Sequence, residues 1–156
     1  MTRYQEPNPL DLYFFAADQA MRRVGLPGTN IHLCLELNGH LDVDGLKRAV
    51  QALWRVYPAT GSRLERSSIT GRPRWRLDAP PADASCVVRV CECVAAREVD
   101  IHGRIEALLN EPIDLRGLPP VRFVVFRGHS EGDRLVARWP HPLMDGRGGV
   151  TLLEEL

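Results

Sequence analysis

The sequence lacks the features that mark membrane-spanning and secreted proteins. It contains no run of about eighteen apolar residues, the length that indicates a spanning helix. Its first residues, 1–7, show no basic start followed by an apolar block, so no secretory signal is visible. These absences favour a cytoplasmic protein and leave a peripheral attachment to a membrane open.

An excess of charge of one sign is also missing. Lysine and arginine together number 20, aspartate and glutamate also number 20, and the formal net charge is zero. A general nucleic-acid surface needs a basic excess, so we expect no nucleic-acid partner, although a local basic patch stays open. Lysine itself is nearly absent, with Lys47 as the only one. The 156 residues, 44% of them hydrophobic, suffice for one domain with a core.

The cysteines form no Cys-x-x-Cys pair, and further spaced ligands are missing, which argues against a zinc site. We therefore expect them to be small, buried, apolar side chains in a reducing compartment. Cys91 and Cys93 alternate along a predicted strand and should share one face. The other two are Cys34 and Cys86.

Helical and strand-like patterns alternate along the chain, without an internal repeat. Apolar spacing predicts helices over 8–22, 42–57 and 101–110, and a last one from about residue 147. Period-two alternation and turn signals predict strands over 31–37, 61–66, 73–77, 86–94, 121–126 and 135–139. Asn8 and Pro9 suit the start of the first helix, and Asp42 or Asp44 that of the second. The pattern predicts an α/β protein, a two-layer α+β sandwich.

The candidate site lies where the last predicted strand meets the last predicted helix. His141, Asp145 and Gly146 form the pattern His-x-x-x-Asp-Gly. A histidine near neutral pH can accept a proton and return it, which suits attack of a hydroxyl or amine on an acyl carbonyl. This pattern makes His141 the candidate general base.

The neighbours of His141 have simpler interpretations too. Asp145 could cap the last helix, brace the loop through an arginine, or relay a proton. Gly146, Gly148 and Gly149 could supply a positive φ or room for a close approach by a substrate or another part of the protein. A phosphate-binding loop is disfavoured because its lysine is missing. No third ligand at regular spacing completes a metal site with His141 and Asp145.

The pattern resembles the signature of the condensation-domain and coenzyme A-dependent acyltransferase superfamily, His-His-x-x-x-Asp-Gly, with Pro140 in place of the first histidine. That superfamily includes chloramphenicol acetyltransferase, peptide-synthetase condensation domains and bacterial wax ester synthase/diacylglycerol acyltransferases. The closest likeness is to the wax ester synthase branch. Further similar segments are 8–15, 33–50, 57–58, 63–64, 111–115, 119–122 and 145–153.

The resemblance implies a chloramphenicol acetyltransferase-like lobe with His141 as general base, and Asp145 and Gly146 shaping the site. Members of the family have two lobes with the histidine in a tunnel between them. Residues 1–156 would be the N-terminal half, and a C-terminal lobe would be the partner. We expect no tightly bound cofactor and no metal. The co-substrate would be an acyl thioester, either acyl-CoA or an acyl-carrier protein, and the acceptor an alcohol or amine.

Two alternatives remain beside the acyltransferase interpretation. One is a condensation domain that forms amide bonds between carrier-bound substrates. The other is a non-catalytic lobe acting as a binding or assembly module. Trp139 is expected in the core, with a place in the tunnel wall as the alternative. The remaining histidines are expected at the surface or in packing: His32, His40, His102 and His129.

Overall fold

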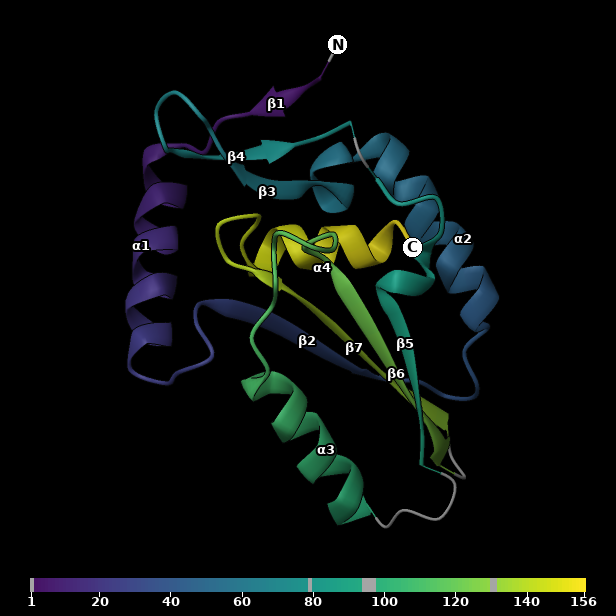
Figure 1. Ribbon diagram of the computed structural model, residues 1–156. Helices are drawn as coiled ribbons and strands as arrows, with labels where there is room; N and C mark the ends of the chain where they lie inside the picture. The colour runs from purple at the N-terminus through teal and green to yellow at the C-terminus, as the bar shows by residue number, and fades with distance from the viewer. Residues whose placement is uncertain (1, 79, 94–97, 130–131) are drawn as a thin grey trace.

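The larger of the two sheets in the described residues forms the centre of the fold. This computed structural model describes residues 2–78, 80–93, 98–129 and 132–156. The sheet has the strand order β2-β7-β6-β5, with β7 antiparallel to both neighbours and β5 parallel to β6. Its strands are β2 (Asn30–Glu36), β5 (Val88–Glu92), β6 (Arg122–His129) and β7 (Gly132–Pro140). The strand that precedes the candidate site is therefore central and paired on both sides (Figure 1).

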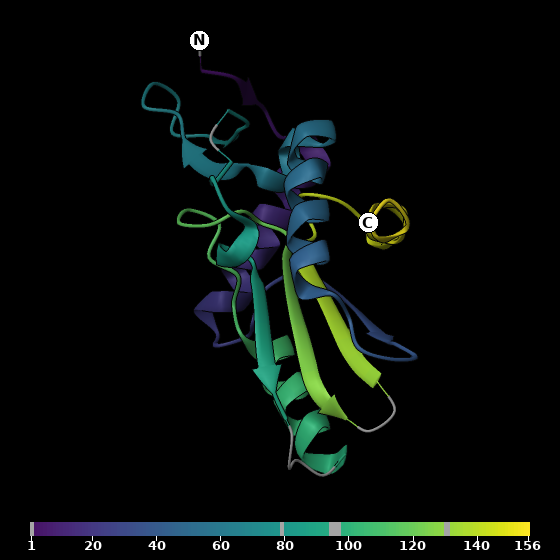
Figure 2. The same ribbon diagram turned by 90° about the vertical axis from the view of Figure 1, so that its right-hand side faces the viewer.

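Helices cover both faces of this sheet. On one face, α2 (Val43–Val56) and α4 (Gly146–Glu154) pack in a core that contains Phe123, Val125 and Trp139. On the other face, α3 (Glu98–Asn110) packs on β6 and β7. Figure 2 shows α3 on the opposite side of the sheet from α2 and α4. The mixed α/β class is confirmed, and α3 adds a layer beyond the two that the sequence suggested.

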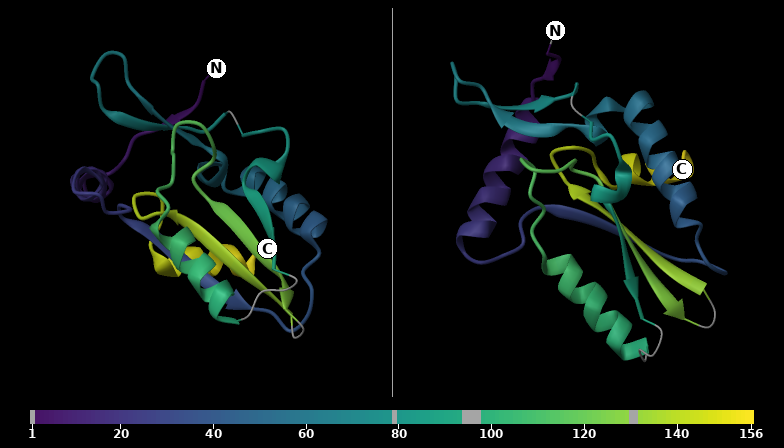
Figure 3. Two further views of the ribbon diagram at one scale, coloured as in Figure 1. Left: turned by 60° about the horizontal axis from the view of Figure 1, so that its bottom comes forward. Right: turned by 45° about the vertical axis from the view of Figure 1, so that its right-hand side comes forward.

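A smaller sheet lies above the site end of the larger one. Its order is β1-β4-β3, from β1 (Tyr4–Gln5), β3 (Arg63–Arg66) and β4 (Pro73–Arg76). Two short 3-10 helices, η1 (Pro58–Gly61) and η2 (Ala84–Cys86), connect the elements. Helix α1 (Pro9–Arg23) lies beside both sheets (Figure 3), and its Phe15 ring lies 5.8 Å from that of Trp75 in β4.

The predicted N-caps of α1 and α2 are confirmed. Asn8 forms a reciprocal capping box with Asp11 at the start of α1. Asp42 accepts a hydrogen bond from the Asp44 amide at the start of α2. Both caps satisfy amide groups that a helix start leaves without partners.

Helix α1 is only partly buried, and Leu10 at its start is 62% exposed. The predicted burial of the cysteines needs correction. Cys34 and Cys86 are exposed, although Cys91 and Cys93 do share one cluster under α3. Cys34 is exposed because β2 is an edge strand, and the apolar cluster between α3 and the sheet does not extend to any residue of β2. Among the described residues, no helix is long and apolar enough to span a bilayer.

Candidate active site

His141 lies in the turn between β7 and α4 and is fixed from two distant parts of the chain. Its amide donates a hydrogen bond to the Thr29 carbonyl, at 2.8 Å, just before β2. Its imidazole stacks on the Phe14 ring of α1, with 3.7 Å between centroids and 16° between planes. The stacking covers one flat side of the imidazole and leaves the edge, where both nitrogens lie. His141 as a residue is partly exposed.

Asp145 caps helix α4. Its backbone is extended, with φ −78° and ψ 179°, and its Oδ1 accepts from the Gly148 amide at 2.7 Å. The capping interpretation is therefore confirmed. No ion pair to an arginine and no hydrogen bond to the His141 ring involves Asp145 within the described residues, so neither the arginine brace nor a direct proton relay is formed there.

The glycines at the start of α4 differ in what surrounds them. None has a positive φ, so that explanation is wrong. A Cβ on Gly149 would lie 2.0 Å from Cζ2 of Trp139, so close approach is the reason for this glycine, and the neighbour is the core indole. A Cβ on Gly146 would meet no atom within 4 Å. Gly146, not Gly149, therefore borders open space.

Trp139 connects the core to the site. The side chain is fully buried, which confirms the core interpretation over a place in a tunnel wall. Its Nε1 donates to the Met144 carbonyl at 3.0 Å, within the turn that carries His141. Trp139 comes two residues before His141, and its indole bonds to Met144, three residues after it. The buried indole thus holds the turn on both sides of His141.

Two clefts lie near these residues. The first, of about 490 Å³, separates η1 from the motif turn and the start of α4. It is lined mainly by apolar side chains, with Asp145 and Arg147 as its charged residues. The lining residues are Tyr57, Ala59, Thr60, Leu143, Met144, Asp145, Arg147, Gly148, Thr151 and Leu152.

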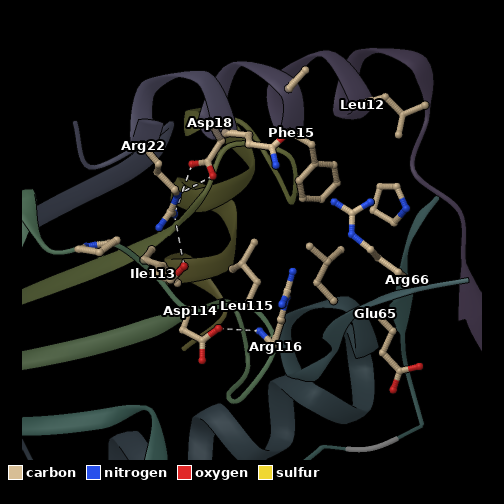
Figure 4. A pocket seen from close by; sticks show the side chains of 15 residues that line it. Leu12, Phe15, Asp18, Arg22, Glu65, Arg66, Ile113, Asp114, Leu115 and Arg116 are labelled. Atoms are coloured by element: carbon tan, nitrogen blue, oxygen red, sulfur yellow. Dashed lines mark hydrogen bonds and ion pairs between the residues drawn. The ribbon is translucent and has the colours of Figure 1, made fainter. Parts of the chain in front are cut away.

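The second cleft, of about 1000 Å³, lies between α1, the β3–β4 hairpin and residues 112–116 (Figure 4). Arg22 spans its end, bonded to Asp18 at 2.7 Å and to the Ile113 carbonyl at 3.3 Å. Phe15 lines this cleft, whereas the neighbouring Phe14 contacts His141. Helix α1 therefore contributes to the cleft and to the histidine at once.

His32 and Arg138 face each other across β2 and β7. Burial and then the Arg138 charge lower the pKa of His32 to about 4. Arg138 is buried and donates to the Leu108 carbonyl at 2.8 Å and to that of Glu111, at the end of α3. Burial lowers the pKa of Arg138 as well. His32 is thus a packing residue that stays neutral at pH 7, as expected for it.

His40 also has a structural partner. Its Nδ1 lies 3.0 Å from Oδ1 of Asp133, a buried carboxylate that also accepts from the Leu41 amide at 2.8 Å. Burial alone would raise the pKa of Asp133, but the hydrogen bonds from His40 and Leu41 and the charge of Arg127 hold it below its usual range. This cluster joins the loop after β2 to the start of β7, the end opposite His141. No group of three or more potential ligands is placed to hold a metal ion among the residues described.

The sequence did not reveal the partners of His141. Phe14 precedes it by more than 120 residues, and Thr29 contributes only a backbone carbonyl. The one available signal was the likeness of residues 8–15 to the opening helix of known acyltransferases. That likeness gave no reason to place Phe14 against the imidazole.

Comparison with known proteins shows which family the chain belongs to. A sequence model of the condensation domain matches residues 27–156. The chain is 31% identical over 124 residues to phthiocerol/phthiodiolone dimycocerosyl transferase of Mycobacterium bovis BCG, and equally to that of Mycobacterium tuberculosis H37Rv. Those matches cover 80% of this chain and 27% of the relatives, so the chain spans just over a quarter of their length.

The fold also matches solved structures. The starter condensation domain of rhizomide synthetase RzmA superposes with a TM-score of 0.80 at 15% identity, over 98% of this chain and 36% of that one. The first condensation domain of the calcium-dependent antibiotic synthetase gives 0.79 at 19%, with the same coverage. An RzmA variant in complex with C8-CoA gives 0.79 at 16%, over 99% and 34%. The expected chloramphenicol acetyltransferase-like lobe is confirmed, and the chain belongs to the condensation-domain family.

Proposed function

We propose that residues 1–156 are the N-terminal lobe of an acyltransferase that moves an acyl group from a thioester to a hydroxyl or amine, with His141 as general base. The observation that carries this proposal is the fixed imidazole of His141. Its amide is bound to Thr29, one side of its ring is covered by Phe14, and its edge is left for a substrate. A C-terminal lobe completes the tunnel and its oxyanion region.

The chemistry needs only one proton carrier from this chain. The acceptor approaches with its O–H or N–H toward a ring nitrogen of His141, which takes the proton as the new bond to the thioester carbonyl forms. The tetrahedral intermediate collapses, the carbon–sulfur bond breaks, and the imidazolium returns the proton to the departing thiolate. No acyl-enzyme forms. A positioned general base of this kind contributes about 10²–10⁴-fold in rate.

Asp145 and Gly146 act on the shape of the site. The Asp145 cap fixes where α4 begins, and with the Trp139 hydrogen bond to Met144 it sets the turn that presents the imidazole. The open side of Gly146 leaves space beside this turn for a substrate or for the second lobe. Both residues are therefore positioning residues in this proposal.

The donor is proposed to be acyl-CoA or an acyl-carrier thioester. An RzmA variant of the same fold was solved in complex with C8-CoA, and the mycobacterial relatives are named as dimycocerosyl transferases. The apolar lining of the cleft between η1 and α4 supports an apolar acyl chain next to the motif. A condensation domain that uses a carrier-bound amine is the second candidate, favoured by the family match.

The test is a turnover assay on the intact protein with a medium-chain acyl-CoA and paired alcohol and amine acceptors. His141→Ala should reduce kcat by about 10²-fold or more with thermal stability retained. His40→Ala is the matched control, since His40 lies in the loop after β2, beside the start of β7 and far from the His141 end, and its loss should leave kcat unchanged. If His141→Ala keeps its turnover within about threefold of wild type, the general-base role is excluded. The acceptor preference separates ester from amide formation, and absence of turnover in the wild type with every donor would favour the non-catalytic alternative.

A further inference from the structure

The loop between β3 and β4, residues 67–72, projects away from the larger sheet and α2 (Figures 1 to 3). At its tip Ile69 is 93% exposed, more than any other large hydrophobic side chain in the described part of the chain. Exposed apolar residues are common on protein surfaces and need no explanation singly. The surroundings of Ile69 are what set it apart.

Basic charge is concentrated in the hairpin. Residues 63–76 contain five arginines and a single acidic residue, Glu65, although the whole chain has a net charge of zero. Glu65 is paired with Arg76 at 3.1 Å. Arg72 is exposed and directly follows the tip, whereas Arg66 precedes the tip and its side chain lines the cleft beside α1 (Figure 4). The remaining arginines of the hairpin are Arg63, Arg74 and Arg76.

Most backbone N–H groups of the tip have hydrogen-bond partners within the loop. The Ser67 side chain accepts from the amides of Ile69 and Thr70, at 3.3 and 3.2 Å. The amides of Ser67 and Gly71 bond to carbonyls within the loop, at 2.9 and 2.8 Å, and Arg66 donates to the Gly71 carbonyl at 3.0 Å. Transfer of this turn out of bulk water therefore leaves few N–H groups without partners, which lowers the cost of placing the loop among lipid headgroups.

We propose that the 67–72 loop attaches the protein peripherally to an anionic lipid surface. Ile69 enters the boundary between headgroups and acyl chains, and Arg72 contacts the lipid phosphates beside it. The apolar and basic contributions are both needed, because either alone gives marginal attachment. A protein partner fits less well, since a stable protein interface buries about 800 Å² on each side and one apolar side chain at a narrow tip offers much less.

The experiment is a vesicle flotation assay with the intact protein. Vesicles of phosphatidylcholine alone are compared with vesicles of phosphatidylcholine and phosphatidylglycerol in equal parts. The protein should float with the anionic vesicles and not with the neutral ones, and raised salt should weaken the binding. Arg72→Gln should weaken the partition to anionic vesicles by about fivefold.

Ile69→Ser tests the insertion itself and should weaken the partition by about tenfold. Two matched controls are available: Val24→Ser removes another strongly exposed apolar side chain, and Arg55→Gln removes an exposed arginine of α2. Both should bind as the wild type does. All variants lie at exposed positions, and circular dichroism verifies that each is folded.

An Ile69→Trp variant gives a second measurement, which reports the environment of the tip in the bound protein. The native tryptophans are buried, so a blue shift on addition of anionic vesicles reports the indole at the tip. Failure of the wild type to float with anionic vesicles overturns the proposal. So does flotation that Ile69→Ser leaves unchanged. These outcomes are independent of turnover and so of the role of His141.

Discussion

The imidazole of His141 lies face to face with the ring of Phe14, although α1 and the motif turn are at opposite ends of the chain. Such a contact fixes the plane of the imidazole without engaging either nitrogen. Stacked aromatic pairs contribute about 0.5–1.5 kcal/mol beyond their buried area. The position of a helix near the N-terminus thereby sets the orientation of the proposed base.

Phe14→Ala should therefore lower kcat by about tenfold while KM changes little, because the imidazole is present but less well oriented. Steady-state kinetics of the intact protein measure both constants. Leu10→Ala, on the exposed start of the same helix, is the control and should leave kcat as it is. An unchanged kcat in Phe14→Ala would show that Thr29 and the turn suffice to orient the ring.

Substitutions of Asp145 separate capping from proton transfer. Asp145→Ala removes the acceptor for the Gly148 amide and should cost about 1 kcal/mol of unfolding free energy. Asn caps helices about as well as Asp, so Asp145→Asn should keep the stability and most of the turnover. Chemical denaturation and kinetics test this together. A relay through the carboxylate would instead make Asp145→Asn as inactive as Asp145→Ala.

Two glycines of α4 should respond differently to the same substitution by alanine. Gly149→Ala places a methyl group against the buried Trp139 and should destabilise the fold by about 1–3 kcal/mol. Gly146→Ala meets no neighbour and should leave the unfolding free energy within about 0.5 kcal/mol. Denaturant titration of both variants is the measurement. Lost turnover in a stable Gly146→Ala variant would indicate that a substrate or the second lobe uses the open space.

The elements that the sequence predicted well are those whose causes are local. The Asn8 cap of α1 and the amphipathic face of α2 depend on residues within a few positions of one another. The strand before His141 and the Asp145 cap were foreseen for the same reason. The family resemblance supplied the chemistry that the spacing of three motif residues could not establish alone.

The remaining features depend on residues distant in sequence. The two-residue strand β1 exists because it pairs with β4, more than 65 residues later. Nothing in the sequence distinguishes Asp133 and Arg138 from surface charges, yet both are buried. Asp133 accepts a hydrogen bond from the loop after β2, and Arg138 donates to carbonyls at the end of α3. The exposure of Cys34 follows from the edge position of β2, which no local pattern encodes.

The neutral His32 makes the stability of the fold depend on pH. Its pKa is about 4 when folded and near 6.5 when unfolded, so between these values the unfolded chain binds more protons. Stability is therefore full above about pH 6.5 and declines as the pH falls toward 4. Denaturation at pH 7 and pH 5 measures this loss. His32→Gln should make the decline smaller, and an equal decline in both proteins would assign it to other groups.

The hydrogen bond from the Trp139 indole to the Met144 carbonyl has a consequence for thermal inactivation. The Trp139 side chain is part of the core and also packs against the turn that carries the imidazole. Heat that unfolds the core will therefore disorder His141 at the same temperature. We expect no temperature range in which the core stays folded while the site is inactive. Loss of turnover and loss of the near-ultraviolet tryptophan signal should share a single midpoint.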